Sequence, residues 1–294
     1  MPELPDVCVY LEALARHAVG QRLERLLIPS PFVLRSYDPP VDAVVGREVR
    51  AVRRIGKRIV LDFGDDLFLV MHLMIAGRLR WRVPGQKLGM GAKLILATFH
   101  FPSGTLYFTE ASSRKRASIV IVRGDASLRA LDPGGIEPME ATREEFHAAL
   151  TRENHTLKRS LTDPRLFSGI GNAYSDEILH AARLSPLKLT RTQSEEESGR
   201  IRDATRAALE KWTTLLRAAA GDGFPEKVTA FYEEMAVHGR FKKCPVCGSP
   251  VQRIVYAENE ANYCARCQTG GKLLADRSLS RLLKDDWPKS IDDL

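Results

Sequence analysis

Cys244-Pro-Val-Cys247 and Cys264-Ala-Arg-Cys267 form two Cys-x2-Cys pairs that enclose sixteen residues. This spacing is typical of structural zinc sites, in which two turns each supply two thiolates to one tetrahedral ion. Four protein ligands leave no open position on the metal, so the site indicates a folding role rather than catalysis. We therefore expect one structural Zn²⁺, held by Cys244, Cys247, Cys264 and Cys267, with a strand over Val251–Tyr256 between the pairs.

Upstream of the cysteines the sequence predicts a helical region. It begins after Leu131–Pro138, a segment rich in Gly and Pro that marks a domain boundary. Apolar residues recur at helical spacing beyond it, and the predicted helices are Arg143–Thr151, Leu157–Thr162, Ala173–Ala182 and Ser194–Ala219. Downstream, Leu279, Leu282 and Leu283 predict a helix in the tail. We expect that helix to pack against the protein, with partner binding as the alternative.

The first part of the chain predicts one helix followed by strands. Apolar residues recur at helical spacing from Pro5 to Leu14, with Pro5 and Asp6 suited to the first turn. From about residue 49 to 122 the pattern changes to strands, predicted at Arg58–Phe63, Leu67–His72, Lys93–Phe101, Thr105–Thr109 and Ala117–Val122. Closely spaced strands behind one helix indicate a β-sandwich or flattened barrel, and the whole chain an α+β fold.

Composition narrows the class of partner. The chain has 294 residues and a formal net charge of +7, with a pI near 9.2, which favours a polyanionic partner. No apolar run approaches the roughly 18–20 residues that span a bilayer, so no membrane partner is expected. No secretory signal is recognisable, and Cys-x2-Cys pairs suit a reducing compartment, so we expect a cytoplasmic protein. The fifth cysteine, Cys8, is expected to be buried and to contribute to packing.

The start of the chain, Met1-Pro2-Glu3, offers a nucleophile. Removal of Met1 would leave the secondary amine of Pro2 beside the Glu3 carboxylate. An α-amine has a pKa of about 7.7–8.0, so a useful fraction is neutral near pH 7 and can form a Schiff base with an aldehyde-like carbon. The positive end of the following helix favours the neutral amine by roughly 0.3–1 kcal/mol, which assists this chemistry without deciding it.

Four motifs together make the chain resemble the formamidopyrimidine-DNA glycosylase and endonuclease VIII family over residues 1–268. They are the start Met1–Asp6, Lys57 in Ile55–Arg58, the segment Gly169-Ile-Gly-Asn172-Ala-Tyr-Ser-Asp-Glu177, and the four-cysteine finger. The start resembles the formamidopyrimidine branch. The resemblance implies domains at 1–133 (catalytic N-terminal helix and β-sandwich), 134–225 (helix–two-turn–helix), 226–268 (zinc finger) and 269–294 (tail), with DNA bound between the first two.

The resemblance also implies roles for individual residues. Pro2 matches the family's nucleophile, which attacks C1′ of a damaged nucleotide, and Glu3 matches its acid/base partner. Lys57 matches a lysine at a hairpin tip that contacts phosphate and assists catalysis. Asn172 matches a phosphate-binding asparagine, and Lys158 a lysine that contacts phosphate or the lesion. Without the resemblance, Lys57 reads as a surface lysine and Gly169-Ile-Gly171 as a tight interhelical turn.

The chain departs from the family pattern at several residues that, in the family, fill the space left by the extruded nucleotide. Met74-Ile75 stand where the family has Gly-Met, so the wedge is Ile75 or shifts to Met74. Ser113–Ser118 replace the Arg-Phe wedge without a phenylalanine. Lys115 and Arg116 are the expected DNA contacts there, and which basic residue replaces the arginine stays open. The loop Gly221–Thr229 is shorter than the family's 8-oxoguanine loop, so the sequence does not name the damaged base.

The finger departs from the pattern as well. Asn259 occupies the place of the family's finger arginine, between Glu258 and Glu260, whose charges would repel phosphate. We expect the first chemical steps to survive and δ-elimination or duplex grip to weaken.

Three functions are consistent with these residues. The leading hypothesis is a monomeric bifunctional DNA glycosylase/AP lyase of base excision repair, bacterial in type and associated with the nucleoid through DNA. A lesion-binding or abasic-site-binding protein with reduced catalysis is the alternative. An unrelated zinc-ribbon nucleic-acid binder would leave Pro2, Glu3 and the Gly169–Asn172 segment as coincidence.

Overall fold

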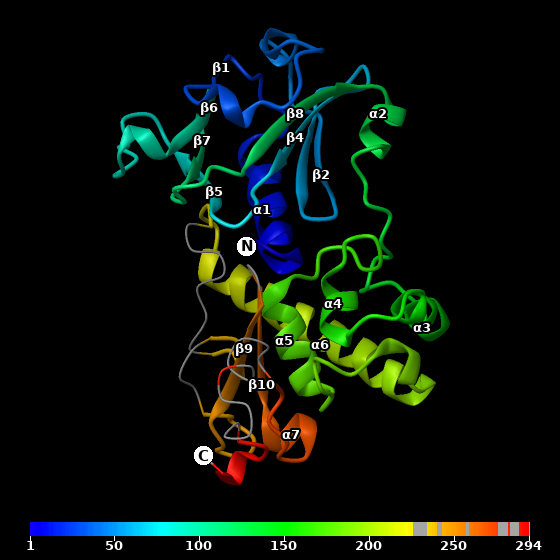
Figure 1. Cartoon of the computed structure of the whole chain (residues 1–294). Helices are drawn as coiled ribbons and strands as arrows, with labels where there is room; N and C mark the ends of the chain where they lie inside the picture. Colours follow the sequence, from blue (N-terminus) through cyan, green and yellow to red (C-terminus); the bar gives the residue numbers. More distant parts are fainter. Residues whose placement is uncertain (226–233, 240–242, 257–258, 276–281, 283–287, 294) are drawn as a thin grey trace. The chain divides into compact units, whose positions relative to one another are not determined.

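The computed structural model describes residues 1–225, 234–239, 243–256, 259–275, 282 and 288–293 (Figure 1). Helices and strands occur in the same chain, as predicted, and the α+β class is confirmed. Contacts divide the chain into two units, residues 1–133 with 212–229 and residues 134–211 with 230–294. The first break follows Pro133, inside the predicted boundary segment. The finer division into four domains stays a prediction.

The first unit contains two four-stranded antiparallel sheets. Their strand orders are β1-β6-β7-β5 and β2-β3-β4-β8. The strands are β1 Arg25–Leu27, β2 Ala51–Ile55, β3 Arg58–Asp62, β4 Leu67–His72, β5 Gly77–Arg82, β6 Ile95–Phe101, β7 Gly104–Glu110 and β8 Ser118–Arg123. The predicted strands are present, except that Lys93 and Leu94 belong to the short helix η3 (Ala92–Leu94). Two further short helices are η1 (Pro31–Val33) and η2 (Val41–Val44).

Alternate residues of β3 enter two different apolar layers. Ile59 and Leu61 lie in the main core, which both sheets share with helix α1 (Leu4–His17). Val60 lies in a second cluster that includes Leu128 of helix α2 (Asp125–Arg129). Successive strand residues point to opposite faces of a sheet. Both faces of this sheet are covered, which explains why β3 and β4 read as nearly continuous apolar runs.

The second unit is helical and ends in a two-stranded hairpin. Its elements are α3 Arg143–Thr151, α4 Leu157–Thr162, α5 Asn172–Ala181, η4 Thr190–Thr192, α6 Glu195–Ala220, β9 Val251–Tyr256, β10 Asn259–Cys264, α7 Ala265–Thr269 and η6 Ile291–Asp293. Helix α6 continues into the first unit. The four predicted helices agree with α3 to α6 within one residue. Caps set some of these limits: Thr142 accepts the Glu145 N–H, and Glu145 accepts the Thr142 N–H in return.

The described ends of the tail pack on the finger. Leu273 and Ile291 are buried in one cluster with Ile254 and Tyr263. The Leu273 N–H donates to the Lys289 carbonyl at 2.9 Å, which brings the two ends of the tail together. These residues agree with the packing interpretation. Leu282 of the predicted stripe is instead 77% exposed, and stripe residues 279 and 283 lie outside the described residues, so packing of the stripe itself stays a prediction.

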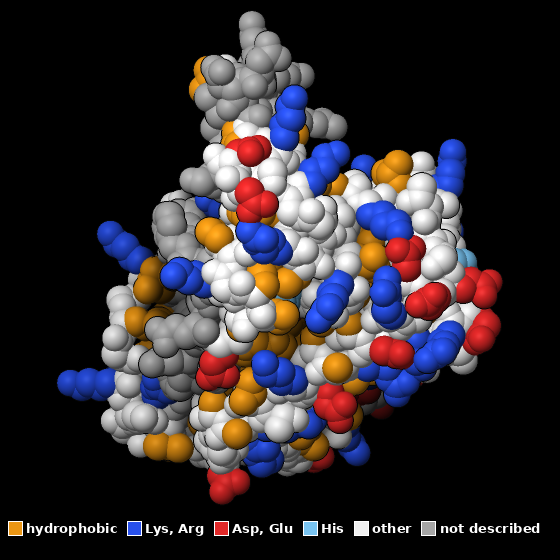
Figure 2. All heavy atoms as spheres, turned by 90° about the horizontal axis from the view of Figure 1, so that it is seen from below, with side chains coloured by type: hydrophobic (Ala, Val, Ile, Leu, Met, Phe, Trp, Pro, Cys, Tyr) orange, Lys and Arg blue, Asp and Glu red, His pale blue; other side chains and the backbone are white. Residues whose placement is uncertain are grey.

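One face of the protein carries side chains of both charges. Figure 2 shows one face on which lysine and arginine side chains are spread among acidic ones, not gathered in a single patch. Among the described residues, no helix is both long enough and apolar enough to cross a membrane.

Candidate functional site

Three segments with predicted site residues leave the same end of one sheet. Arg58 pairs with His72, and His72 pairs with Ser118, so these residues form one row across β3, β4 and β8. β3 begins at Arg58, β4 ends at His72 and β8 begins at Ser118. The β2–β3 tip, the turn after β4 and the loop before β8 therefore emerge together (Figure 1).

The chain terminus belongs to the same charged neighbourhood. Pro2 and Glu3 are buried just ahead of α1, and the Glu3 N–H donates to the Asp6 carboxylate at 2.7 Å. Burial lowers the pKa of the Met1 amine; Arg78 and Lys57 lower it further, against the charges of Glu3 and Asp6. Loss of Met1 would place the amine one residue further on, at Pro2. The same burial and cations would favour its neutral, nucleophilic form.

Lys57 lies at the tip of the β2–β3 hairpin. Ile55 pairs with Arg58, which leaves Gly56 and Lys57 as a two-residue loop, and Gly56 has a φ of +57°. Positive φ at the first loop position is the pattern of a type II′ turn, where glycine is preferred. Burial lowers the pKa of Lys57, while the charges of Glu3 and Asp6 raise it. Lys57 is thus a partly buried amine close to both carboxylates, unlike the surface lysine that a basic run suggests.

The turn after β4 presents an apolar side chain. Met74 has a φ of +52°, and the Gly77 N–H donates to the Leu73 carbonyl at 2.8 Å. A Cβ on residue 77 would lie 2.2 Å from the Leu73 oxygen, so this turn requires glycine there. Ile75 at the tip is 53% exposed, whereas Met74 is only partly exposed. Of the two wedge candidates, Ile75 is the one that projects.

The loop before β8 is folded around a buried carboxylate. Glu110 is 1% exposed and accepts the N–H groups of Arg116, at 3.0 Å, and Ala117, at 3.2 Å. The Lys115 ammonium donates to the Glu110 carbonyl. The structure therefore places Lys115 and Arg116 beside the turn and the hairpin tip. That these two residues contact DNA stays a prediction.

His72 ends β4 beside the two cations of the hairpin tip. Burial, with Arg58 and Lys57, lowers its pKa to about 4. Because the folded state binds a proton less readily than the unfolded chain, stability is fully present above the ordinary pKa near 6.5 and is lost as pH falls toward 4.

The pH dependence of unfolding tests this assignment. Wild type should lose about 2 kcal/mol from this group between pH 8 and pH 5. A His72→Gln variant should lack that part of the dependence, because glutamine does not titrate. Urea unfolding at several pH values measures both proteins. Equal slopes for the two proteins between pH 8 and pH 5 would contradict the burial of an uncharged His72.

In the second unit, Asn172 begins α5 directly after a glycine turn. Gly169 has a φ of +82°, and Gly171 precedes the helix as its N-cap. The Asn172 carbonyl accepts bonds from the Lys158 ammonium, at 2.7 Å, and from the Ser175 hydroxyl, at 3.0 Å. The side chain of Asn172 remains partly exposed at a helix N-terminus, a position that suits a phosphate oxygen.

The environment of Lys158 differs from the direct contact that the resemblance implies. Its side chain is 3% exposed, and its ammonium lies 2.5 Å from the Asp176 carboxylate, which is fully buried. Asp176 also contacts His238 Nδ1 at 2.8 Å and accepts from Asn262 Nδ2 at 3.0 Å. A buried ion pair of this kind holds a turn in place. Lys158 thus holds the Asn172 carbonyl from a buried position, and a direct contact of Lys158 with phosphate or the lesion stays a prediction.

Helix α5 also anchors the finger through its next residues. The Glu177 carboxylate accepts the backbone N–H groups of Ala236, Val237 and His238 at 2.7–2.9 Å. His180 Nε2 lies 3.2 Å from Cys244 Sγ. One helix thus carries the Asn172 turn at its start and the contacts to the cysteine cluster near its end.

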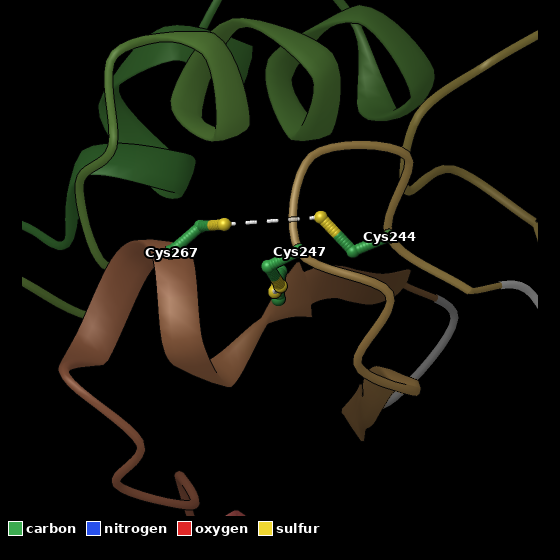
Figure 3. Close-up of side chains that lie close together, drawn as sticks. Cys244, Cys247 and Cys267 are labelled. Carbon is green, nitrogen blue, oxygen red and sulfur yellow. Dashed lines mark hydrogen bonds between the residues drawn. The ribbon is translucent and has the colours of Figure 1, made fainter.

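The four cysteines meet as the spacing predicts. Their Sγ atoms all lie within 4.8 Å of one another. Cys244 and Cys267 are 3.8 Å apart (Figure 3), and Cys247 and Cys264 are 3.4 Å apart. Four thiolates at about 2.3 Å from a tetrahedral Zn²⁺ would be about 3.8 Å apart. Burial raises the pKa of Cys267 to about 11, so a cation is needed to hold this thiol as thiolate. The cluster fits one structural zinc, and His180 would orient one ligand.

The acidic segment of the finger is described only in part. Glu260 forms an ion pair with Arg253 at 2.5 Å across the β9–β10 hairpin, so its charge is compensated locally. Glu258 and the Asn259 side chain lie outside the described part of the chain. Repulsion of phosphate by Glu260 is weaker than the sequence alone suggests, and the expectation of weakened δ-elimination stays a prediction.

Sequence reasoning missed the residues that hold the site together. Glu110, His238 and Asn262 belong to no motif recognisable in one sequence. The partners of these three residues and of Asp176 lie 6 to 86 residues away. Asp176 and Glu177 are inside the quoted motif, but the motif alone gives neither a role. Two adjacent carboxylates on a helix whose other face is apolar are the one signal that could have pointed to buried polar contacts.

Three family models match the chain. The formamidopyrimidine-DNA glycosylase N-terminal domain matches residues 1–169, the formamidopyrimidine-DNA glycosylase H2TH domain matches residues 134–216, and a zinc finger found in FPG and IleRS matches residues 241–270. Together these matches cover residues 1–216 and 241–270, which include the cysteine cluster.

Individual proteins are similar over most of their length. Formamidopyrimidine-DNA glycosylase of Desulforamulus reducens is 30% identical over 91% of this chain and 99% of its own. The MutM (FPG) structure from Thermus thermophilus is 30% identical, with a TM-score of 0.76, over 91% of this chain and 98% of that one. A Lactococcus lactis Fpg structure bound to DNA with an abasic site has 25% identity and a TM-score of 0.79, over 91% and 99%.

Proposed function

Because this chain belongs to the formamidopyrimidine-DNA glycosylase family, a family of base excision repair enzymes, we propose that it is a bifunctional DNA glycosylase and AP lyase. It removes a damaged base through a Schiff base on Pro2 and then nicks the strand by β-elimination. The observation that carries this proposal is the buried amino terminus beside Glu3, Asp6, Lys57 and Arg78.

Pro2 supplies the nucleophile. Its secondary amine, freed by loss of Met1, attacks C1′; the bond from C1′ to the base breaks, and the electron pair leaves with the base, which takes up a proton. When the sugar ring opens, the Pro2 nitrogen and C1′ form an iminium ion. The iminium acidifies the neighbouring C2′ proton, and loss of that proton expels the 3′ phosphate. Burial of the terminus supports this chemistry because it lowers the pKa of the Met1 amine, and the same burial would favour the neutral form of an amine at Pro2.

Glu3 and Lys57 serve as the proton-transfer and phosphate groups. A buried carboxyl next to the nucleophile is placed to exchange protons with the sugar as charge develops. Lys57 reaches phosphate from the hairpin tip, in cationic form while a phosphate is bound. Asn172 binds the backbone at the start of α5, and Lys115 and Arg116 are further contacts. Phosphate contacts of this kind position the duplex without reading its sequence.

The partner is damaged DNA, on which the protein acts as a monomer. The Lactococcus lactis relative was solved with abasic-site DNA, which supports a substrate of that class here. A protein with this partner would act on the bacterial nucleoid, in the cytoplasm.

Ile75 is the wedge that fills the space of the extruded nucleotide. An Ile75→Ala variant should lose about tenfold or more in base release from a duplex, because the lost apolar contact no longer offsets unstacking. A single-stranded substrate should be affected much less. Excision rates on both substrates measure this.

Val83→Ala is the matched control, since Val83 is a similarly exposed apolar residue of the same unit. Equal loss for Ile75→Ala on single-stranded and duplex DNA, or equal loss for Val83→Ala, would contradict the wedge assignment.

Borohydride reduction on DNA with one abasic site tests the proposed function. An iminium intermediate is reduced to a stable amine, so the protein becomes covalently attached to the strand. Tight, salt-sensitive binding without any adduct would instead favour a lesion-binding protein.

A further inference from the structure

A pocket in the second unit contains none of the residues to which the proposed function gives a role. Its volume is about 370 Å³, and it lies between the end of α3, the loop that follows and η4. The lining residues are His147, Thr151, Arg152, Asn154, Thr190, Arg191 and Gln193. Two are arginines and none is acidic.

The negative charges of the acidic residues near this pocket are neutralised by basic residues that do not line it. Glu153 contacts His155 at 2.8 Å and Arg165 at 3.7 Å. Glu197 is bonded to the Lys188 ammonium. The guanidinium of Arg191 forms no ion pair within the described part of the chain, and its backbone N–H donates to Asn154 Oδ1. The pocket is therefore rich in hydrogen-bond donors and positive in charge, which suits an anion with several acceptor oxygens.

Gln193 provides a second, independent observation. It lines the pocket and is 8% exposed, yet neither its amide nitrogen nor its amide oxygen has a hydrogen-bond partner among the described residues. Buried polar groups are nearly always paired, so an unpaired amide at a pocket wall indicates a missing partner. Its N–H group would add a neutral donor to the two guanidinium groups.

We propose that this pocket binds a phosphomonoester, as carried by a mononucleotide. Arg152 and Arg191 pair with the phosphate oxygens, and Gln193 donates to the same group from the inner wall. The volume exceeds what a bare phosphate fills and falls in the range of small-molecule sites. The same chemistry is present in a free nucleotide and in the phosphorylated end of a DNA strand.

Calorimetric titration of the full chain tests the proposal with five probes. They are inorganic phosphate, a deoxynucleoside 5′-monophosphate, the unphosphorylated nucleoside, and an undamaged hairpin oligonucleotide in two forms, with and without a 5′ phosphate. We expect saturable 1:1 binding of the monophosphate and at least about tenfold weaker binding of the nucleoside. Preference for the 5′-phosphorylated hairpin over the monophosphate would assign the ligand to DNA ends, and the reverse to free nucleotides.

Arg191→Gln and Gln193→Leu should each weaken monophosphate binding at least about tenfold, because each removes one donor to the phosphate. Gln193→Leu replaces an unpaired amide by an apolar group of similar size, so the variant should keep its melting temperature. Arg206→Gln, an exposed arginine of α6 with the same charge change, is the matched control and should bind as wild type does.

The proposal is overturned if no probe binds saturably up to about 10 mM, or if binding is unchanged in both pocket variants. It does not depend on catalysis: loss of the borohydride adduct would refute the proposed function and leave these titrations unaffected.

Discussion

Blocking the terminal amine should abolish the covalent adduct with abasic DNA. An N-terminally extended protein places an amide where the nucleophile should be, so both trapping and strand nicking should fall by about three orders of magnitude or more. Pro2→Gly keeps a primary amine at the same place and should weaken the adduct without eliminating it. Gel analysis of borohydride-reduced mixtures measures both, after mass spectrometry has verified that Met1 is absent from the native protein.

The control for this experiment is the extended protein after its extension has been removed by a protease that leaves Pro2 free. Activity should return, which excludes misfolding as the reason for the loss. Lys57 is the competing nucleophile, because burial lowers its pKa and makes the neutral amine more accessible. Peptide mapping of the adduct separates the two amines. A modified Lys57 peptide, or full trapping by the extended protein, would refute Pro2 as nucleophile.

Asp176→Asn should destabilise the protein by about 3–5 kcal/mol, because it leaves the Lys158 ammonium buried without its counter-charge. The change also disturbs the bonds of Asp176 to His238 and Asn262. Urea unfolding, followed by the circular dichroism of the helices, measures the loss. Affinity for abasic DNA should fall as well, since Lys158 holds the carbonyl of Asn172.

Asp203→Asn is the matched control in the same unit. Asp203 pairs with Arg143 at 3.4 Å and with its chain neighbour Arg202 at 3.0 Å, and its own side chain is 53% exposed. Its loss should change the free energy of unfolding by less than about 1 kcal/mol. In a double-mutant cycle, Lys158→Met combined with Asp176→Asn should lose less than the sum of the single changes. Additive losses, or a loss below about 1 kcal/mol for Asp176→Asn alone, would show that the pair does not act as a unit.

Local patterns predicted the elements well, and the reasons are physical. The cysteine spacing predicted the cluster because ligand geometry is set within two short turns. Helices α3 to α6 follow apolar periodicity and caps, which act over a few residues. Strands β1, β2, β5 and β10 were not individually predicted. β1 has three residues, and β5 alternates arginines with buried residues, so neither forms an apolar run.

The environment of the site residues was not predictable in the same way. The basic run Arg53, Arg54, Lys57 and Arg58 suggests a solvated surface, yet burial dominates the pKa shift of Lys57. The sequence suggests that Lys158 is free to bind phosphate, whereas in the structure its ammonium is buried against the carboxylate of Asp176, 18 residues away. Both outcomes depend on which distant segments meet, and a single sequence contains no direct record of that.

The shared exit of three loops from one end of the sheet has a consequence for how this enzyme can change over evolutionary time. Residues 56–57, 74–76 and 111–116 lie outside the main core, whereas Leu73 and Ala117, at the ends of two of these connections, are buried in it. Substitutions in these loops change the side chains at the proposed DNA-binding end of the sheet, while the β-sandwich keeps its packing. The departures at Met74, Ile75 and Ser113–Arg116 fall in two of the three loops. If Pro2 is the nucleophile as proposed, preference for one damaged base over another can therefore change while the fold and the terminal amine are inherited unchanged.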